Sequence, residues 1–226
     1  MTVEWELDHI FLALDPRSEE GTELIRRGLE PSYRRDHPGQ GTQNLCFCFD
    51  NAYLELLWTR DKAELAANAL ARSKLPERMA WPGKGVCPFG IAIRPVSGRD
   101  DLPELPFKSW AYRPSYLPQG TAIQVATMSD DARLPFLFHV PGSKPPAEWP
   151  DGLAGTRQLA TGLVRIVAIR LHLSCAPVAA MAKVQKSLPW FGVNWKAPEP
   201  MLDIVMQDGS GKLKRMPLPF APPVEG

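Results

Sequence analysis

Two apolar segments near the N-terminus each carry an ionisable residue at a central position, and this pattern strongly constrains the fold. Residues 7–14 and 52–58 have the composition of β-strands, with His9 in the first and Glu55 in the second. Because side chains alternate faces along a strand, His9 is expected to share a face with residues 7, 11 and 13. An unpaired ionisable group in such surroundings is costly, so both residues should have partners. A divalent metal and a substrate oxygen are both candidates.

The residues between these strands complete a compact unit. Asp15-Pro16 predicts the start of a helix that ends at Gly28, because Asp is a good N-cap, Pro suits the first helical turn and Gly a helix end. A strand over residues 44–49 and the turn Asp50-Asn51 then lead into the strand that carries Glu55. The predicted order is β-α-β-β-β.

Two further segments follow. A helix is expected over 61–75, and then a β-rich middle with strands near 89–94, 110–112, 121–126 and 134–139. A third block repeats the β-α-β-β order, with a strand over 163–173, a helix over 177–188 and strands over 191–195 and 201–206. The sequence therefore predicts a first module over 1–60, a helix and β-rich segment over 61–160, and a second module with a proline-rich tail over 161–226, in one compact domain.

Composition narrows the classes of function. The net charge of +1 gives no electrostatic footprint for nucleic acid. Apolar runs stay well short of the roughly 18 residues that a membrane-spanning helix needs, and the N-terminus lacks a secretory signal, so a cytoplasmic location is expected. The four cysteines include no C-x-x-C pair, which favours buried, reduced thiols over a zinc ribbon or a redox motif.

The N-terminal unit resembles the vicinal oxygen chelate superfamily, and its glyoxalase-like branch in particular. The resemblance rests on Leu7-Asp8-His9 at the start, on residues 37–44, and on Tyr53-Leu54-Glu55-Leu56-Leu57 at the end; residues 88–94 and 134–136 support it more weakly. It implies an α+β fold of paired βαβββ modules forming a curved mixed sheet around a cleft, here with an elaborated β-rich middle segment. Members include glyoxalase I, extradiol dioxygenases, methylmalonyl-CoA epimerase and metal-free antibiotic-sequestering (bleomycin resistance) proteins.

The same resemblance implies a metal held by His and Glu from the first and last strands of each module. His9 and Glu55 fall on these positions in the first module. If the third block is the second module, Asp203 falls opposite Glu55 and Ala168 opposite His9, with His172 four residues further on the same face as Ala168.

If the middle segment is the partner module instead, Phe89 falls opposite His9 and His139 lies beyond the last ligand position, where it could approach the cleft. Neither alignment completes a set of four ligands. The cofactor expected is one divalent metal, Zn, Mn, Fe or Ni, or none.

Other side chains are candidates for contact with a substrate. His37, Thr42 and Asn44 lie in or after a Pro-Gly loop that could border the cleft; the alternative for His37 is a structural role in that loop. Trp110 and Tyr112 could form an aromatic wall, although at this spacing such residues are more often part of the core. His139 completes the set, with the role of an ordinary strand histidine as its alternative.

Two functions from different classes follow. The first is a lyase, isomerase or dioxygenase that acts on a small oxygen-rich molecule, with His9 and Glu55 as catalytic residues and as metal ligands if a metal is bound. The second is a metal-free protein that sequesters a planar or aromatic small molecule. The intact His9/Glu55 pair favours the first, and the incomplete ligand set favours the second. A small-molecule ligand is expected in either case, and a homodimer is compatible with both.

Overall fold

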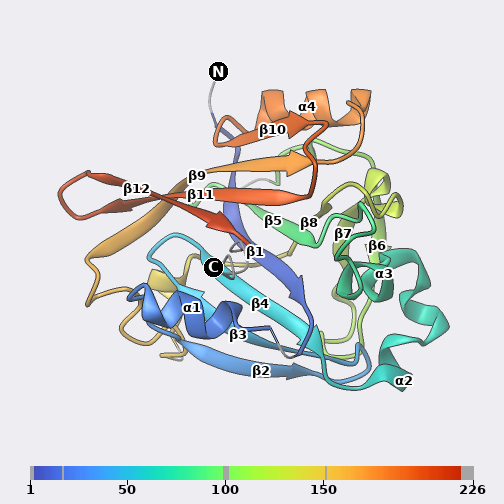
Figure 1. The fold of residues 1–226 in the computed structure, drawn as a ribbon, viewed down its shortest axis with the longest axis horizontal. Helices are drawn as coiled ribbons and strands as arrows, with labels where there is room; N and C mark the ends of the chain where they lie inside the picture. Colours follow the sequence, from blue (N-terminus) through green and yellow to red (C-terminus); the bar gives the residue numbers. More distant parts are fainter. Residues whose placement is uncertain (1–2, 17, 99–101, 151, 220–226) are drawn as a thin grey trace, which may run out of the picture.

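The structure is a computed structural model that describes residues 3–16, 18–98, 102–150 and 152–219, so the proline-rich tail beyond Pro219 lies outside the described residues. Two mixed sheets lie one above the other in Figure 1. The larger sheet contains eight strands, and the smaller one contains four. Within the described residues there is no helix long and apolar enough to span a bilayer.

The larger sheet is built from two halves of the same topology. The first half contains β1 (Trp5–Leu14), β2 (Tyr33–His37), β3 (Thr42–Cys48) and β4 (Tyr53–Thr59). The second contains β5 (Phe89–Pro95), β6 (Ser109–Tyr112), β7 (Ile123–Ala126) and β8 (Phe136–His139). The strand order is β2-β3-β4-β1-β5-β8-β7-β6. In each half the first strand is parallel to the last, and the antiparallel β1–β5 pair joins the halves. The expected α+β fold of paired modules is confirmed.

The third block forms a sheet of its own. It contains β9 (Leu163–Leu173), α4 (Ala179–Ser187), β10 (Phe191–Trp195), β11 (Met201–Asp208) and β12 (Leu213–Leu218). The order β10-β9-β11-β12 places its first strand beside its second and third, whereas β1 pairs with the last strand of its module. The strands that continue the sheet of the first module therefore come from the middle segment. The division of the chain at residues 60 and 160 stays a prediction.

The helices are shorter than the sequence predicts. α1 (Glu20–Arg26) begins five residues after Asp15. The helix expected over 61–75 is divided into α2 (Lys62–Leu65), a 3-10 turn (Asn68–Ser73) and α3 (Leu75–Met79). Two more 3-10 turns span Thr127–Asp130 and Pro146–Glu148.

The interruption of the second helix has a packing reason. Leu65, Leu70 and Leu75 are all buried in one hydrophobic cluster. They are five residues apart, a spacing that a continuous helix of 3.6 residues per turn would place on different sides. The chain breaks, with Lys74 in the left-handed region at φ 57°, and all three leucines reach the same cluster.

The two faces of the larger sheet pack into different clusters. Ile10 and Leu12 belong to a cluster shared with the second sheet, and Phe11 and Ala13 belong to the opposite one. Leu7 lies with Ile10, contrary to the expectation that it shares a face with His9. The reason is a β-bulge between Leu7 and His9, because an extra residue reverses the alternation.

Candidate functional site

The face of the larger sheet that carries Phe11 and Ala13 encloses a cavity of about 150 Å³. Polar side chains of the first module line one part of it: His9, Tyr33, Arg35, His37, Gln40, Asn44, Tyr53 and Glu55. Apolar and aromatic side chains line the rest: Phe11, Leu57, Leu75, Tyr112, Tyr116, Leu117, Ile123, Phe136, Phe138 and Val140. The cavity suits a small molecule with an apolar body and a polar head.

Loops from the two halves of the sheet close over this cavity. Gln40, in the loop after β2, accepts hydrogen bonds at Oε1 from the hydroxyls of Tyr112 (2.9 Å) and Tyr116 (3.2 Å). Ser115 donates to the carbonyl oxygen of Pro38 at 2.9 Å. β2 and β6 are the opposite edges of the sheet, so these contacts show how strongly the sheet curves. We call residues 113–120 the strap.

His9 lies at the polar end of the cavity, with 6% of its surface exposed. Its Nδ1 is 2.5 Å from Oδ1 of Asp8, and its Nε2 is 3.7 Å from Oε2 of Glu55. The ring stacks on Tyr53, with centroids 4.4 Å apart. A carboxylate can only accept from Nδ1–H, so this bond places the proton on Nδ1 in the neutral ring and leaves the Nε2 lone pair toward Glu55.

Asp8 is the residue that makes this arrangement, and it is 1% exposed. Its Oδ2 accepts from Arg94 Nη1 at 3.3 Å and from the hydroxyl of Ser143. Burial alone would raise the pKa of the Asp8 carboxyl, but the hydrogen bond and charge of His9, the charge of Arg94 and the Ser143 bond together hold it below its usual value. Asp8 is therefore an anion, and its carboxylate faces Nδ1 of His9.

Glu55 is oriented by a neighbour on β3. Asn44 donates from Nδ2 to Glu55 Oε1 at 2.6 Å, across the antiparallel pair of β3 and β4. This bond leaves Oε2 as the carboxylate oxygen nearer to His9. The structure thus brings together His9, Glu55 and Asn44, three of the residues singled out in the sequence.

Three other predicted residues lie in or around the cavity. His37 and Tyr112 line it, while Thr42 is fully buried and accepts a hydrogen bond from Gln40 Nε2 at 2.8 Å. Thr42 Oγ1 is also 3.0 Å from His37 Nδ1. Burial lowers the pKa of His37, which keeps this ring neutral near pH 7. Thr42 thus supports the loop that carries Gln40, without lining the cavity.

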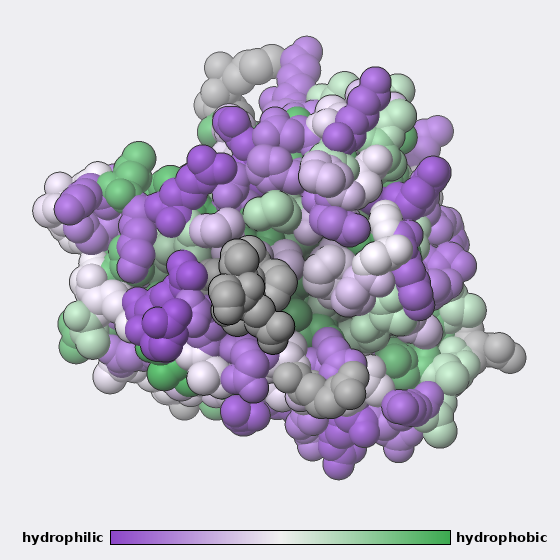
Figure 2. All heavy atoms as spheres, viewed as in Figure 1, coloured by the Kyte–Doolittle hydropathy of each residue, from purple (hydrophilic) through white to green (hydrophobic). Residues whose placement is uncertain are grey.

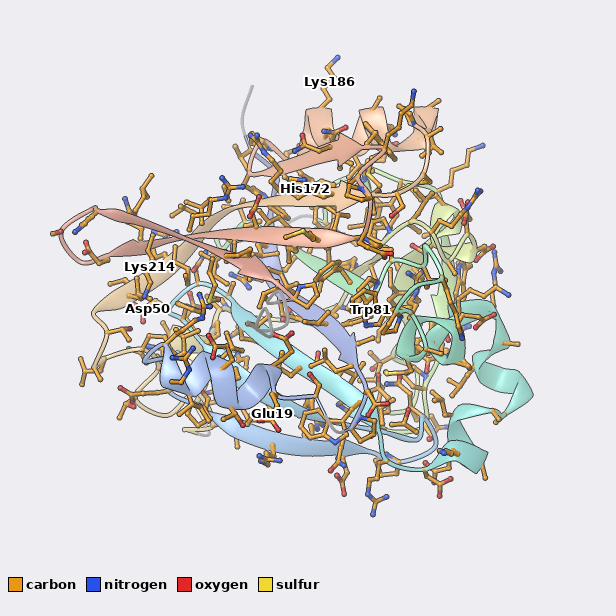
Figure 3. The ribbon with its side chains drawn as sticks, viewed as in Figure 1. Glu19, Asp50, Trp81, His172, Lys186 and Lys214 are labelled. Atoms are coloured by element: carbon orange, nitrogen blue, oxygen red, sulfur yellow. The ribbon has the colours of Figure 1, made fainter. Side chains whose placement is uncertain are left out.

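Four predicted residues lie elsewhere. His139 is on the other face of β8, where its ring packs in a T-shaped arrangement with the ring of Trp5, with the ring centroids 5.3 Å apart. Trp110 lies under the guanidinium of Arg72, 4.6 Å from the ring centroid, and is not among the residues that line the cavity. His172 and Asp203 pair with each other at 2.8 Å in the second sheet, and Figure 3 shows His172 there, apart from β4.

A metal of the kind that the fold implies does not fit the donors that are present. His9 and Glu55 are two possible ligands, but the pocket-side residues of β5 and β8 include Ala92, Phe136 and Phe138. Among the described residues, no group of three or more His, Cys, Asp or Glu side chains is placed to hold a metal ion. Catalytic zinc sites ordinarily have three protein ligands. The residues of this cavity therefore do not match the four-ligand pattern.

Sequence reasoning missed Asp8, Arg94, Ser143, Gln40 and Tyr116. Asp8 was hidden because neighbours on a regular strand point to opposite faces, and its contact with His9 depends on the bulge. The other four come from β5 and from three loops, far from His9 in the chain. A buried Asp beside a buried His is the one local signal that could have drawn attention to the pair.

The sequence matches a protein-family model, and this match agrees with the geometry. A family model described as a glyoxalase-like domain matches residues 7–176, about three quarters of the chain. No curated protein matches the chain. A crystal structure of a hypothetical protein from Staphylococcus aureus is similar at 14% identity and a TM-score of 0.38, over 93% of this chain and 85% of the other.

Proposed function

The chain belongs to the glyoxalase-like domain family, within the vicinal oxygen chelate superfamily, and on that premise we propose that it is an isomerase or lyase that moves a proton on a small carbonyl compound. The single observation that carries the proposal is the position of His9. Its Nδ1 is held by Asp8 at 2.5 Å, and its Nε2 lies 3.7 Å from Glu55, which lines the cavity together with His9. A histidine held in this way is suited to act as a general base.

In the proposed reaction His9 takes a proton from a carbon atom next to a carbonyl group. The electrons of the broken C–H bond pass into the carbonyl group, and the imidazolium then returns the proton to a neighbouring atom of the same molecule. Asp8 stabilises the imidazolium from one side and Glu55, 3.7 Å from Nε2, from the other. Acid–base catalysis by one positioned side chain contributes about 10²- to 10⁴-fold to a rate. Each step of the proposed reaction uses only His9, Asp8 and Glu55.

The walls of the cavity suggest the substrate class. Phe11, Phe136 and Phe138 form an aromatic cluster with ring centroids 5.3 to 6.2 Å apart. Leu57 and Ile123 add to the same apolar lining. The substrate is therefore a small molecule with an apolar or aromatic body, its carbonyl end directed at His9 and Glu55.

The test uses proton exchange, which needs no knowledge of the final product. Small aromatic and aliphatic carbonyl compounds are incubated with the protein in D₂O, and loss of the proton next to the carbonyl is followed by NMR. We expect exchange of at least one compound to be accelerated by the wild type and lost in His9→Gln. His172→Gln is the matched control, because His172 also pairs with an aspartate but does not line this cavity.

A second function is favoured by a separate observation. Ala92 and Phe138 lie on the pocket side of the second half of the larger sheet, which makes the cavity well suited to hold an apolar molecule without transforming it. The same experiment separates the two. If the NMR signals of some compounds broaden with the wild-type protein but no compound exchanges its proton, the result supports sequestration and contradicts the enzyme.

A further inference from the structure

The two oxygens of the Asp8 carboxylate have different partners. Oδ1 is 2.5 Å from His9 Nδ1, whereas Oδ2 accepts from Arg94 and from Ser143. Arg94 and Ser143 do not line the cavity that contains His9. The hydrogen bonds that link them to His9 run through Asp8.

Arg94 is anchored independently of Asp8. Its Nη2 donates to the backbone carbonyl of Asn51 at 2.6 Å, and its Nε donates to Glu6 at 2.9 Å. The residue is 2% exposed. A planar guanidinium with three donors in use has one orientation, so its Nη1 presents a fixed hydrogen atom to Asp8.

Ser143 comes from a different part of the chain. It lies in the loop after β8 and is only partly buried, and its hydroxyl bonds the same oxygen of Asp8. Pro141, Gly142 and Ser143 also border a second hollow, which has His139 in its wall. The loop therefore contacts Asp8 through Ser143, and Ser143 is not among the residues that line the cavity.

We propose that Arg94 and Ser143 are positioning residues that hold the Asp8 carboxylate in the one rotation that fixes His9 with its proton on Nδ1. Asp8 is the extra residue of a bulge, so strand pairing alone does not dictate where its side chain points. If Oδ2 loses a donor, the carboxylate is free to turn, and the Nδ1 proton loses its acceptor. The value of this arrangement for turnover rests on the proposed function, but the arrangement itself can be measured without a substrate.

The experiment is ¹⁵N NMR of the histidine ring nitrogens in substrate-free protein, near neutral pH. We expect His9 of the wild type to be the Nδ1–H tautomer. Ser143→Ala removes one hydrogen bond, which corresponds to about a three- to tenfold shift in the tautomer ratio toward Nε2–H. Arg94→Lys keeps the positive charge but loses the fixed set of guanidinium donors, and it should shift the tautomer ratio further toward Nε2–H.

Ser115→Ala is the matched control, since Ser115 also donates one hydrogen bond from a loop but bonds Pro38 rather than Asp8. It should leave the His9 signals unchanged. His9 signals that stay unchanged in both Ser143→Ala and Arg94→Lys would overturn the inference, as would equal shifts in the control. A tautomer shift in a protein that exchanges no carbon-bound proton would support the inference and count against the proposed function alone.

Discussion

The ring of Phe11 lies directly over Gly90, its partner in the β1–β5 register. A Cβ atom built on Gly90 would be 1.9 Å from Cε1 of that ring. Phe11 lines the cavity and packs near Phe136, so glycine at this position is what allows the aromatic wall to form.

Gly90→Ala should therefore displace Phe11 and reduce the free energy of unfolding by about 1 to 3 kcal/mol, as overpacking does elsewhere. Urea denaturation measures the change. Gly209→Ala is the control, because the nearest atom to its new Cβ would be 3.8 Å away. A Gly90→Ala protein as stable as the wild type would show that Phe11 has room to move.

Arg78 joins two connecting segments in the interior, the one before β5 and the one between β7 and β8. Its guanidinium is fully buried and donates to the backbone carbonyls of Cys87, Leu134 and Ser129 at 2.7 to 3.0 Å. Burial lowers the pKa of Arg78 to about 10, so it remains charged at pH 7. Arg78→Met leaves these acceptors without donors and should cost about 2 to 4 kcal/mol of unfolding free energy.

Arg72→Met provides the comparison for this prediction. Arg72 forms an exposed ion pair with Asp130 at 3.1 Å, and such pairs contribute about 0 to 1 kcal/mol. Thermal denaturation of the two variants should separate them clearly. Equal losses would mean that the carbonyls find other donors when Arg78 is removed.

His139 is a buried histidine whose two ring nitrogens have no hydrogen-bond partner among the residues that the structure describes. Burial lowers its pKa, against a smaller opposite effect of the Asp8 charge. Below about pH 6.5 His139 is protonated in the unfolded chain, whereas in the folded chain it stays neutral to a lower pH. His139 therefore reduces the free energy of unfolding as the pH falls. His139→Phe replaces the ring by one that binds no proton, and it should stabilise the protein more at pH 5.5 than at pH 7.5.

Urea denaturation at the two pH values is the measurement. Burial lowers the pKa of His37 as well, so part of the acid sensitivity should persist in the variant. If His139→Phe stabilises the protein equally at both pH values, the ring titrates normally in the folded state.

Gln40 connects the two edges of the curved sheet through Tyr112 and Tyr116. Gln40→Ala removes both bonds, so the strap over residues 113–120 should open more readily. We expect its backbone amides to exchange with D₂O about tenfold faster, the factor that corresponds to about 1.4 kcal/mol. Amides of β9 in the second sheet serve as the internal reference. Unchanged exchange in the strap would show that the Ser115 bond to Pro38 is sufficient to hold it.

The local parts of this fold could be predicted from the sequence because their signals are local. Apolar segments predicted β1 and β4. His9 and Glu55, which the sequence singled out on these strands, both line the cavity, and their roles stay a prediction. The second helix was predicted too long, because its leucines follow the packing of a cluster rather than a helical period. Helix propensity gave way there to burial of Leu65, Leu70 and Leu75.

The pairing of distant strands could not be read from the chain. Both the middle segment and the third block offer strands that could accompany the first module, and only the β1–β5 register shows which one does. The face that His139 presents depends on the register of β8 against β5, because a shift of one residue in a strand moves every side chain to the other side.

By itself, the sequence determined which segments form the strands of the first module and that His9 and Glu55 are ionisable residues within two of them, since strand signals depend only on neighbouring residues. The tertiary structure alone decided what those side chains meet. The guanidinium of Arg94 and the hydroxyl of Ser143 come from separate elements and bond Asp8, the bulge residue that in turn bonds His9. Hydrogen bonds between residues more than 80 positions apart depend on how the sheets close, and no local pattern records that.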